Sequence, residues 1–78
     1  MKYVTASMRK AASVGMELAG KLRCGEDEVM LNESGVMNCP GLEGSLEERA
    51  AELGGRVMTE EEALAYKREL GLGVEDFI

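Results

Sequence analysis

The stretch that decides the fold is residues 45–62, which read SLEERAAELGGRVMTEEE. It contains the pattern Ser/Thr-x-x-Glu twice, once from Ser45 and again from Thr59. In this pattern the hydroxyl and the glutamate accept hydrogen bonds from amides that otherwise lack a partner at the start of a helix. Acidic residues directly after each cap favour the positive end of the helix dipole. The stretch therefore predicts two helices, one beginning at each cap.

Glycines mark the ends of these two helices. Gly54-Gly55 stops the first and Gly71 stops the second, because glycine readily takes the left-handed conformation in which many helices end. Between the helices, Arg56-Val57-Met58 predicts a short strand that joins a neighbouring hairpin. The predicted elements are a helix over 45–53, a strand over 56–58 and a helix over 60–70. The inward face of the last helix is expected to contain Ala63, Leu64, Tyr66 or Lys67, and Leu70.

The N-terminal third predicts one longer helix, over residues 5–23. Apolar or small residues recur there at heptad-like spacing, and Thr5 or Ser7 can cap the start. Gly15 and Gly20 each lower helix propensity by about 1 kcal/mol relative to alanine, which close packing would offset. Small side chains make this face flat and allow another backbone to come near. We therefore predict an interaction face made of Met8, Ala11, Gly15, Leu18, Ala19 and Leu22.

A β-hairpin is predicted over residues 28–39. Its strands are Glu28–Leu31 and Val36–Cys39, joined by the four-residue loop Asn32–Gly35, which contains a glycine where positive φ is most needed. Pro40-Gly41 ends the pairing because proline cannot donate to a strand ladder. The element order is then α-β-β-α-β-α. This order predicts an α+β fold, a single small domain over 1–78 with three helices on a small antiparallel sheet.

Composition excludes several classes of function. The 78-residue chain has no histidine, which removes imidazole bases, proton shuttles and ligands. No run of about 18 apolar residues exists, so no membrane association is expected. The first 25 residues lack the continuous apolar stretch of a secretory signal, and we therefore expect a cytoplasmic chain with reduced thiols. The sequence identifies no catalytic residue, metal site, cofactor or small-molecule substrate, and we expect no enzyme.

The two cysteines leave three alternatives open. Cys24 and Cys39 could form a disulfide, contribute to a metal site, or remain two separate thiols. A catalytic thiolate usually has a histidine partner, and a structural zinc site usually takes four Cys or His ligands. Two separate, unreactive thiols are therefore the favoured interpretation, with a cysteine-based redox protein as an alternative function.

Charge is distributed unevenly along the chain. Residues 1–25 carry five Lys or Arg and one acid, whereas residues 26–78 carry four Lys or Arg and 14 acids. This asymmetry and the small size favour a small acidic, non-catalytic protein-interaction or regulatory module, self-associating as a homodimer or binding another protein. A nucleic-acid-related regulator is the alternative: a DNA mimic, or a weak binder with a helix-turn-helix over 45–70. The acidic start of the second helix makes nucleic-acid binding the less favoured interpretation.

Overall fold

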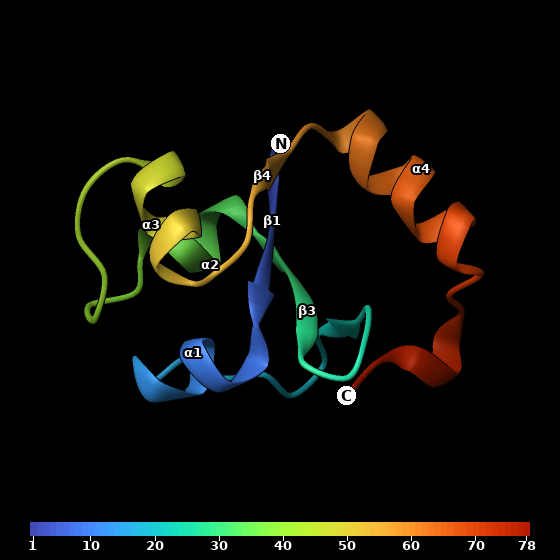
Figure 1. Ribbon diagram of the computed structural model, residues 1–78, viewed down its shortest axis with the longest axis horizontal. Helices are drawn as coiled ribbons and strands as arrows, with labels where there is room; N and C mark the ends of the chain where they lie inside the picture. Colours follow the sequence, from blue (N-terminus) through green and yellow to red (C-terminus); the bar gives the residue numbers. More distant parts are fainter.

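The computed structural model describes all residues from Met1 to Ile78. It shows an α+β fold with a four-stranded antiparallel sheet, in the strand order β2-β3-β1-β4 (Figure 1). The α+β class and the antiparallel sheet are confirmed, but the chain has four α-helices rather than three, and a different order. The elements are β1 (Tyr3–Ser7), α1 (Met8–Ser13), β2 (Leu22–Arg23), β3 (Glu28–Asn32), α2 (Glu33–Met37), α3 (Leu46–Glu52), β4 (Val57–Met58), α4 (Glu60–Leu70) and a 3₁₀-helix, η1 (Val74–Asp76).

One face of the sheet carries the larger core. Val4 pairs with Leu31 and Ala6 with Val29 across β1 and β3, and because side chains alternate along a strand, these four point to the same side. Helices α1, α2 and α3 cover this side of the sheet (Figure 1). Together they form a cluster of 11 buried residues: Val4, Ala6, Ala11, Val29, Leu31, Val36, Cys39, Leu42, Leu46, Ala50 and Leu53.

The opposite face carries a smaller core under α4. Its four buried members are Leu22, Met30, Met58 and Ala63. Partly buried side chains surround them: Tyr3, Cys24, Tyr66 and Leu72. The sheet is therefore covered on both faces, and the middle three residues of β1 and of β3 are all buried.

The helix predicted over 5–23 is wrong. The chain instead forms β1, the short helix α1 and, after a loop, β2. Gly15 and Gly20 have φ of 84° and 81°, so they turn the backbone rather than continue a helix. Ser7 does cap a helix, since its hydroxyl accepts from Lys10 N at 3.3 Å, but that helix ends at Ser13.

Of the hairpin predicted over 28–39, the first strand is confirmed and the second strand is wrong. Its first strand is β3, but the residues that follow form α2 instead of a loop and a second strand. The Asn32 side chain accepts a hydrogen bond from Gly35 N at 2.7 Å and caps this helix. Asparagine favours both turns and helix caps, so the local pattern did not distinguish them. Strand β3 pairs with β2, which precedes it, and with β1, which is far away in the sequence; β4 pairs with the other side of β1.

The two capped helices are confirmed. Both capping boxes are present, at Ser45 with Glu48 and at Thr59 with Glu62. Each helix ends at a glycine with positive φ, Gly54 in one case and Gly71 in the other. The strand predicted over 56–58 is also present, as Val57–Met58.

Arg49 connects α3 to the end of α2. Its Nε donates to Gly44 O at 2.8 Å, and its Nη1 lies within 3.2 Å of the carbonyl oxygens of Val36 and Met37. A cation is favourable at these carbonyls, which form the negative end of the α2 dipole. This one side chain therefore holds the loop between the two helices against the core.

Candidate interaction surface

The six residues predicted to form an interaction face do not share one helix. Met8 and Ala11 lie in α1, Leu22 lies in β2, and Gly15, Leu18 and Ala19 lie in the loop between them. Ala11 is fully buried in the larger core, whereas Leu22 is buried in the smaller core on the opposite side of the sheet. The single helical face is therefore absent, and a role of these residues in binding stays a prediction.

A different apolar surface is exposed at the C-terminal end of the described chain. Seven large hydrophobic residues are exposed in the molecule, and five of them lie between residues 64 and 78. We call these five the α4–tail surface: Leu64, Leu70, Val74, Phe77 and Ile78. Val74 is the most exposed at 87%, and Phe77 is 51% exposed. These side chains follow one another along α4 and the segment after it, and exposed apolar side chains grouped together are a feature of interaction sites.

The way α4 packs explains part of this exposure. The helix fully buries only Ala63, while Tyr66 and Lys67 are half-buried. Leu64 and Leu70 were expected to point inward, and this expectation is wrong, since they are 49% and 42% exposed. The sequence pattern identified a helix there but not which of its leucines would contact the sheet.

Backbone hydrogen bonds hold the segment after α4 against the chain before β2. Ile78 N donates to Lys21 O and Gly20 N donates to Ile78 O, both at 2.8 Å. Phe77 forms an isolated bridge with Leu22, so the segment extends the sheet beyond β2. The side chains of Phe77 and Ile78 are both about half exposed. The backbone therefore holds apolar side chains in place while leaving them open to contact.

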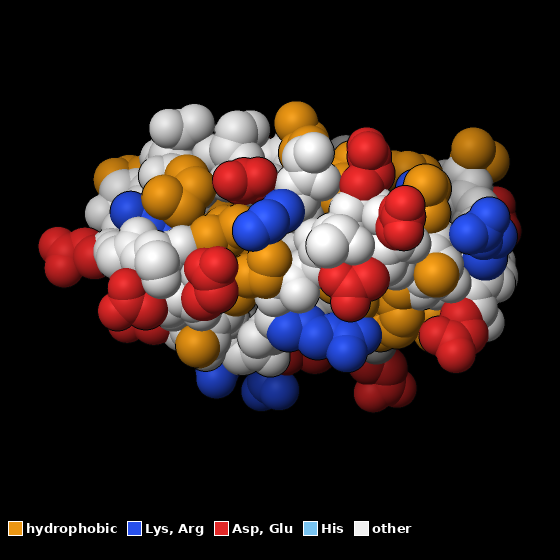
Figure 2. Space-filling view, turned by 90° about the horizontal axis from the view of Figure 1, so that it is seen from above, with side chains coloured by type: hydrophobic (Ala, Val, Ile, Leu, Met, Phe, Trp, Pro, Cys, Tyr) orange, Lys and Arg blue, Asp and Glu red, His pale blue; other side chains and the backbone are white.

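Acidic residues surround the α4–tail surface. Figure 2 shows apolar side chains interleaved with acidic ones over the right-hand half of the molecule, where α4 lies. Residues 60–78 contain two cations, Lys67 and Arg68, against six acids: Glu60, Glu61, Glu62, Glu69, Glu75 and Asp76. Charge around this surface is thus predominantly negative.

The cysteines lie on opposite faces of the sheet and are both free. Cys39 is buried in the larger core, with its Sγ 3.6 Å from Val14 O. Burial, followed by the negative charge of Glu28, raises the pKa of the Cys24 thiol to about 11. At pH 7 only about one Cys24 in 10⁴ would then be a thiolate. These positions give no support to a disulfide between them or to an activated nucleophile.

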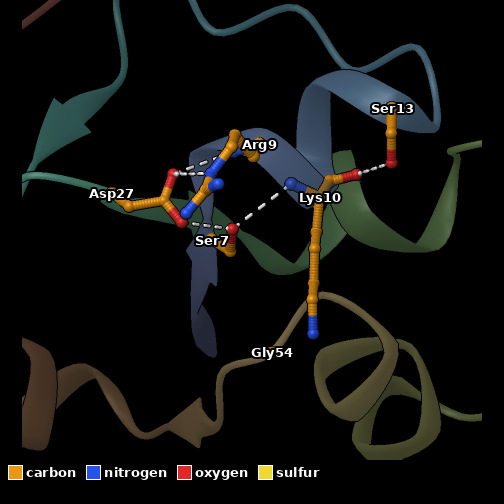
Figure 3. Close-up of a pocket in the computed structure, with 6 residues that line it drawn as sticks. All are labelled: Ser7, Arg9, Lys10, Ser13, Asp27 and Gly54. Atoms are coloured by element: carbon orange, nitrogen blue, oxygen red, sulfur yellow. Dashed lines mark hydrogen bonds and ion pairs between the residues drawn. The ribbon is translucent and has the colours of Figure 1, made fainter.

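A polar hollow lies beside the start of α1 (Figure 3). Helix α1 lies on the opposite side of the sheet from α4 (Figure 1). Asp27 occupies the hollow, accepting from Ser7 Oγ at 2.6 Å and from Arg9 N at 3.1 Å. The Lys10 side chain points toward Gly54 and away from the Ser7 hydroxyl (Figure 3). Because the hydroxyl donates to a carboxylate and the ammonium group points elsewhere, these residues do not form a serine–lysine pair. Asp27 caps α1 here, and its hydrogen bonds with Ser7 and Arg9 lower its pKa.

Helices α3 and α4 do not form a helix-turn-helix. Leu46 and Ala50 of α3 belong to the larger core, and Ala63 of α4 belongs to the smaller one. The two helices therefore lie on opposite sides of the sheet, as Figure 1 also shows. The arrangement expected for a DNA reader over 45–70 is absent.

No group of three or more His, Cys, Asp or Glu residues is placed to hold a metal ion. No helix is both long enough and apolar enough to cross a membrane. No protein-family model, curated protein or solved structure matches this chain. The inference about function therefore depends on the surface of this molecule alone.

Proposed function

We propose that this chain is a small, non-catalytic interaction module that self-associates through the α4–tail surface. The observation that supports it is the concentration of five exposed large apolar side chains between Leu64 and Ile78. Their positions on an 11-residue helix and on a backbone paired with the sheet mean that little ordering is needed before contact. An isologous contact between two copies would remove this apolar area from water on both partners at once.

The expected association is weak. Burying the exposed half of a large apolar side chain contributes about 1 kcal/mol. Ten such side chains, five from each copy, contribute roughly 10 kcal/mol, against a cost of association of about 4–15 kcal/mol. Acidic residues at the rim of the surface oppose contact between two copies further. With an association cost near the lower end of that range, about 5 kcal/mol remains, and we expect a dimer with a dissociation constant on the order of 0.1–1 mM.

Sedimentation equilibrium over a concentration series tests the proposal. Wild-type protein should move from monomer to dimer, and Leu64→Glu and Val74→Glu should each weaken the dimer about tenfold or more, because each places a charge in an apolar contact. Met37→Glu is the matched control, since Met37 is also exposed, at 40%, but lies on α2. A wild-type monomer at all concentrations, or equal weakening by all three substitutions, would contradict the proposal.

A further inference from the structure

A hollow of about 210 Å³ lies between the sheet and the C-terminal part of the chain. Apolar groups of Tyr3, Leu22, Met30 and Phe77 line it, together with the cationic side chains of Lys21 and Lys67. A smaller hollow of about 80 Å³ shares Tyr3, Met30 and Lys67 with it and continues beneath α4 to Ala63. The smaller core on this face of the sheet is therefore incompletely filled.

The two lysines at this hollow have no carboxylate partner. The molecule contains a single ion pair, between Arg9 and Asp27 at 3.8 Å, although the chain carries 15 acids. Lys21 and Lys67 are both half-buried, as is typical of lysines whose aliphatic stems lie against apolar surface while their ammonium groups stay near water. They reach the hollow from different elements: Lys21 lies in the loop before β2, and Lys67 lies in the last turn of α4. An anion in the hollow would lie near both cations.

No acidic side chain lines the larger hollow beside Lys21 and Lys67. Glu28 accepts the hydrogen bond of the Tyr66 hydroxyl, and Asp76 accepts from Gly73 N at 2.8 Å. Glu60 lines only the smaller hollow, at the end away from Lys21. The larger hollow is therefore lined by two cationic side chains, Lys21 and Lys67, and by no acidic one.

We propose that this hollow binds a small organic carboxylate with an apolar body. The carboxylate would pair with Lys21 and Lys67, and the body would lie on the apolar floor formed by Tyr3, Leu22 and Met30. The volume is below the roughly 300–1,000 Å³ of pockets for drug-sized ligands. With water occupying about 30 Å³ per molecule, it suits a ligand of on the order of seven to ten non-hydrogen atoms. The proposal does not depend on self-association.

Phenylacetate and its neutral analogue phenylacetamide are suitable probes, followed by two-dimensional ¹H–¹⁵N NMR of the whole chain. Phenylacetate should give saturable shifts of the amide signals of Lys21, Leu22 and Met30, with a dissociation constant on the order of 1 mM. Phenylacetamide has the same shape without the charge and should bind at least about threefold more weakly. Absence of saturable shifts, or equal affinity for both probes, would overturn the proposal.

Lysine variants separate the proposed site from non-specific attraction. Lys21→Gln and Lys67→Gln should each weaken phenylacetate binding about threefold to fivefold, the size of a partly exposed charge contact. Lys10→Gln is the matched control, since Lys10 lines the polar hollow beside α1. Thermal unfolding of each variant checks that it is folded. If all three substitutions weakened phenylacetate binding equally, binding would depend only on the net charge of the protein, and the proposed site would be wrong.

The Val74→Glu variant distinguishes this proposal from that of self-association. Val74 does not line the hollow, whereas Phe77 lines it and also belongs to the α4–tail surface, so a dimer would cover part of the hollow. The variant should therefore bind phenylacetate at least as tightly as wild type even where dimer formation is lost. Loss of binding in this variant would mean that the hollow is completed only in a dimer, and the proposal as stated would be wrong.

Discussion

Tyr66 makes the side-chain hydrogen bond that connects α4 to the central sheet. Its hydroxyl donates to Glu28 Oε1 at the start of β3, and the Arg56 guanidinium lies 5.6 Å from the centre of its ring. The hydrogen bond to Glu28, followed by burial, raises the pKa of Tyr66 to about 12 from an ordinary value of 10.0. The protonated phenol is therefore favoured more strongly in the folded chain than in the unfolded chain. Its contribution to stability is complete below pH 10 and is lost as the pH rises toward 12.

Replacing Tyr66 by Phe should lower the free energy of unfolding by about 1 kcal/mol at neutral pH, because the hydrogen bond is lost. The difference between wild type and variant should shrink as the pH rises from 10 toward 12. Urea denaturation at several pH values measures this difference, and Tyr3→Phe is the matched control, since no side-chain hydrogen bond of Tyr3 is present. A difference that stays constant up to pH 12 would show that the Tyr66–Glu28 contact does not form as described.

Single residues differ in how far the sequence reveals their role. Ser45 and Thr59 act within their own helix, three residues from their partners, and were predicted correctly as caps. The contact of Tyr66 with Glu28 joins two distant segments, so no local pattern could indicate it. The positions of Lys21 and Lys67 at one hollow depend in the same way on the three-dimensional arrangement.

The turn from α3 to β4 brings the backbone of Gly55 close to the backbone of β1. Gly55 N donates to Ala50 O, and Gly54 N to Ala51 O, both at 3.0 Å, with Gly54 in the left-handed conformation. A Cβ added to Gly55 would lie 1.6 Å from Thr5 O, in the backbone of β1. The glycine pair therefore ends α3 and also lets the chain pass close against the central strand, which places β4 at the sheet edge.

Substituting Gly55 by Ala should lower the free energy of unfolding by roughly 3 kcal/mol, because backbone atoms would have to move apart. Gly25→Ala is the matched control, since a Cβ there would lie 3.6 Å from Glu28 Cβ, an ordinary contact. It should change stability by less than about 0.5 kcal/mol. Urea denaturation monitored by far-ultraviolet circular dichroism measures both. Equal stability of the two variants would contradict the close approach of Gly55 to β1.

Elements with complete local signals were predictable, and those defined by distant pairing were not. α3 and α4 have caps at both ends, and their predicted boundaries agree closely with the structure. β1 lacks the alternation of a half-buried strand, because Val4, Thr5 and Ala6 are all buried between two layers. The apolar residues of β1 and those that follow it also recur at helical spacing, and this spacing led to the prediction of a helix over 5–23. Gly15 and Gly20 were a signal against one long helix in the sequence, since each glycine inside a helix lowers its helix propensity.

At the scale of the whole molecule, the two faces of the sheet are unequally covered. Eleven buried residues form the core under α1, α2 and α3, and four form the core under α4. The thinner side contains both the unfilled hollow and the exposed Leu64 and Leu70. Apolar residues that a larger core would have enclosed thus remain available for contact. The sequence predicted an interaction face at residues 8–22 on a single helix, which the structure does not contain, and the binding role of those residues stays a prediction.

Net charge sets the expected salt dependence of self-association. Each chain carries a net charge of −6, and the molecule is 22 Å across its middle dimension, so two copies in contact repel one another by several kcal/mol without salt. The screening length falls from about 30 Å at 0.01 M salt to about 10 Å at 0.1 M. An apolar contact between like-charged copies should therefore become stronger as salt is added, with the dissociation constant falling by roughly tenfold to a hundredfold over this range. Sedimentation equilibrium at the two salt concentrations measures the change, and the Val74→Glu variant should remain mostly monomeric at both. A dimer that weakens with salt would instead be held by attraction between opposite charges, and the α4–tail surface, with its six acids against two cations, would be the wrong interface.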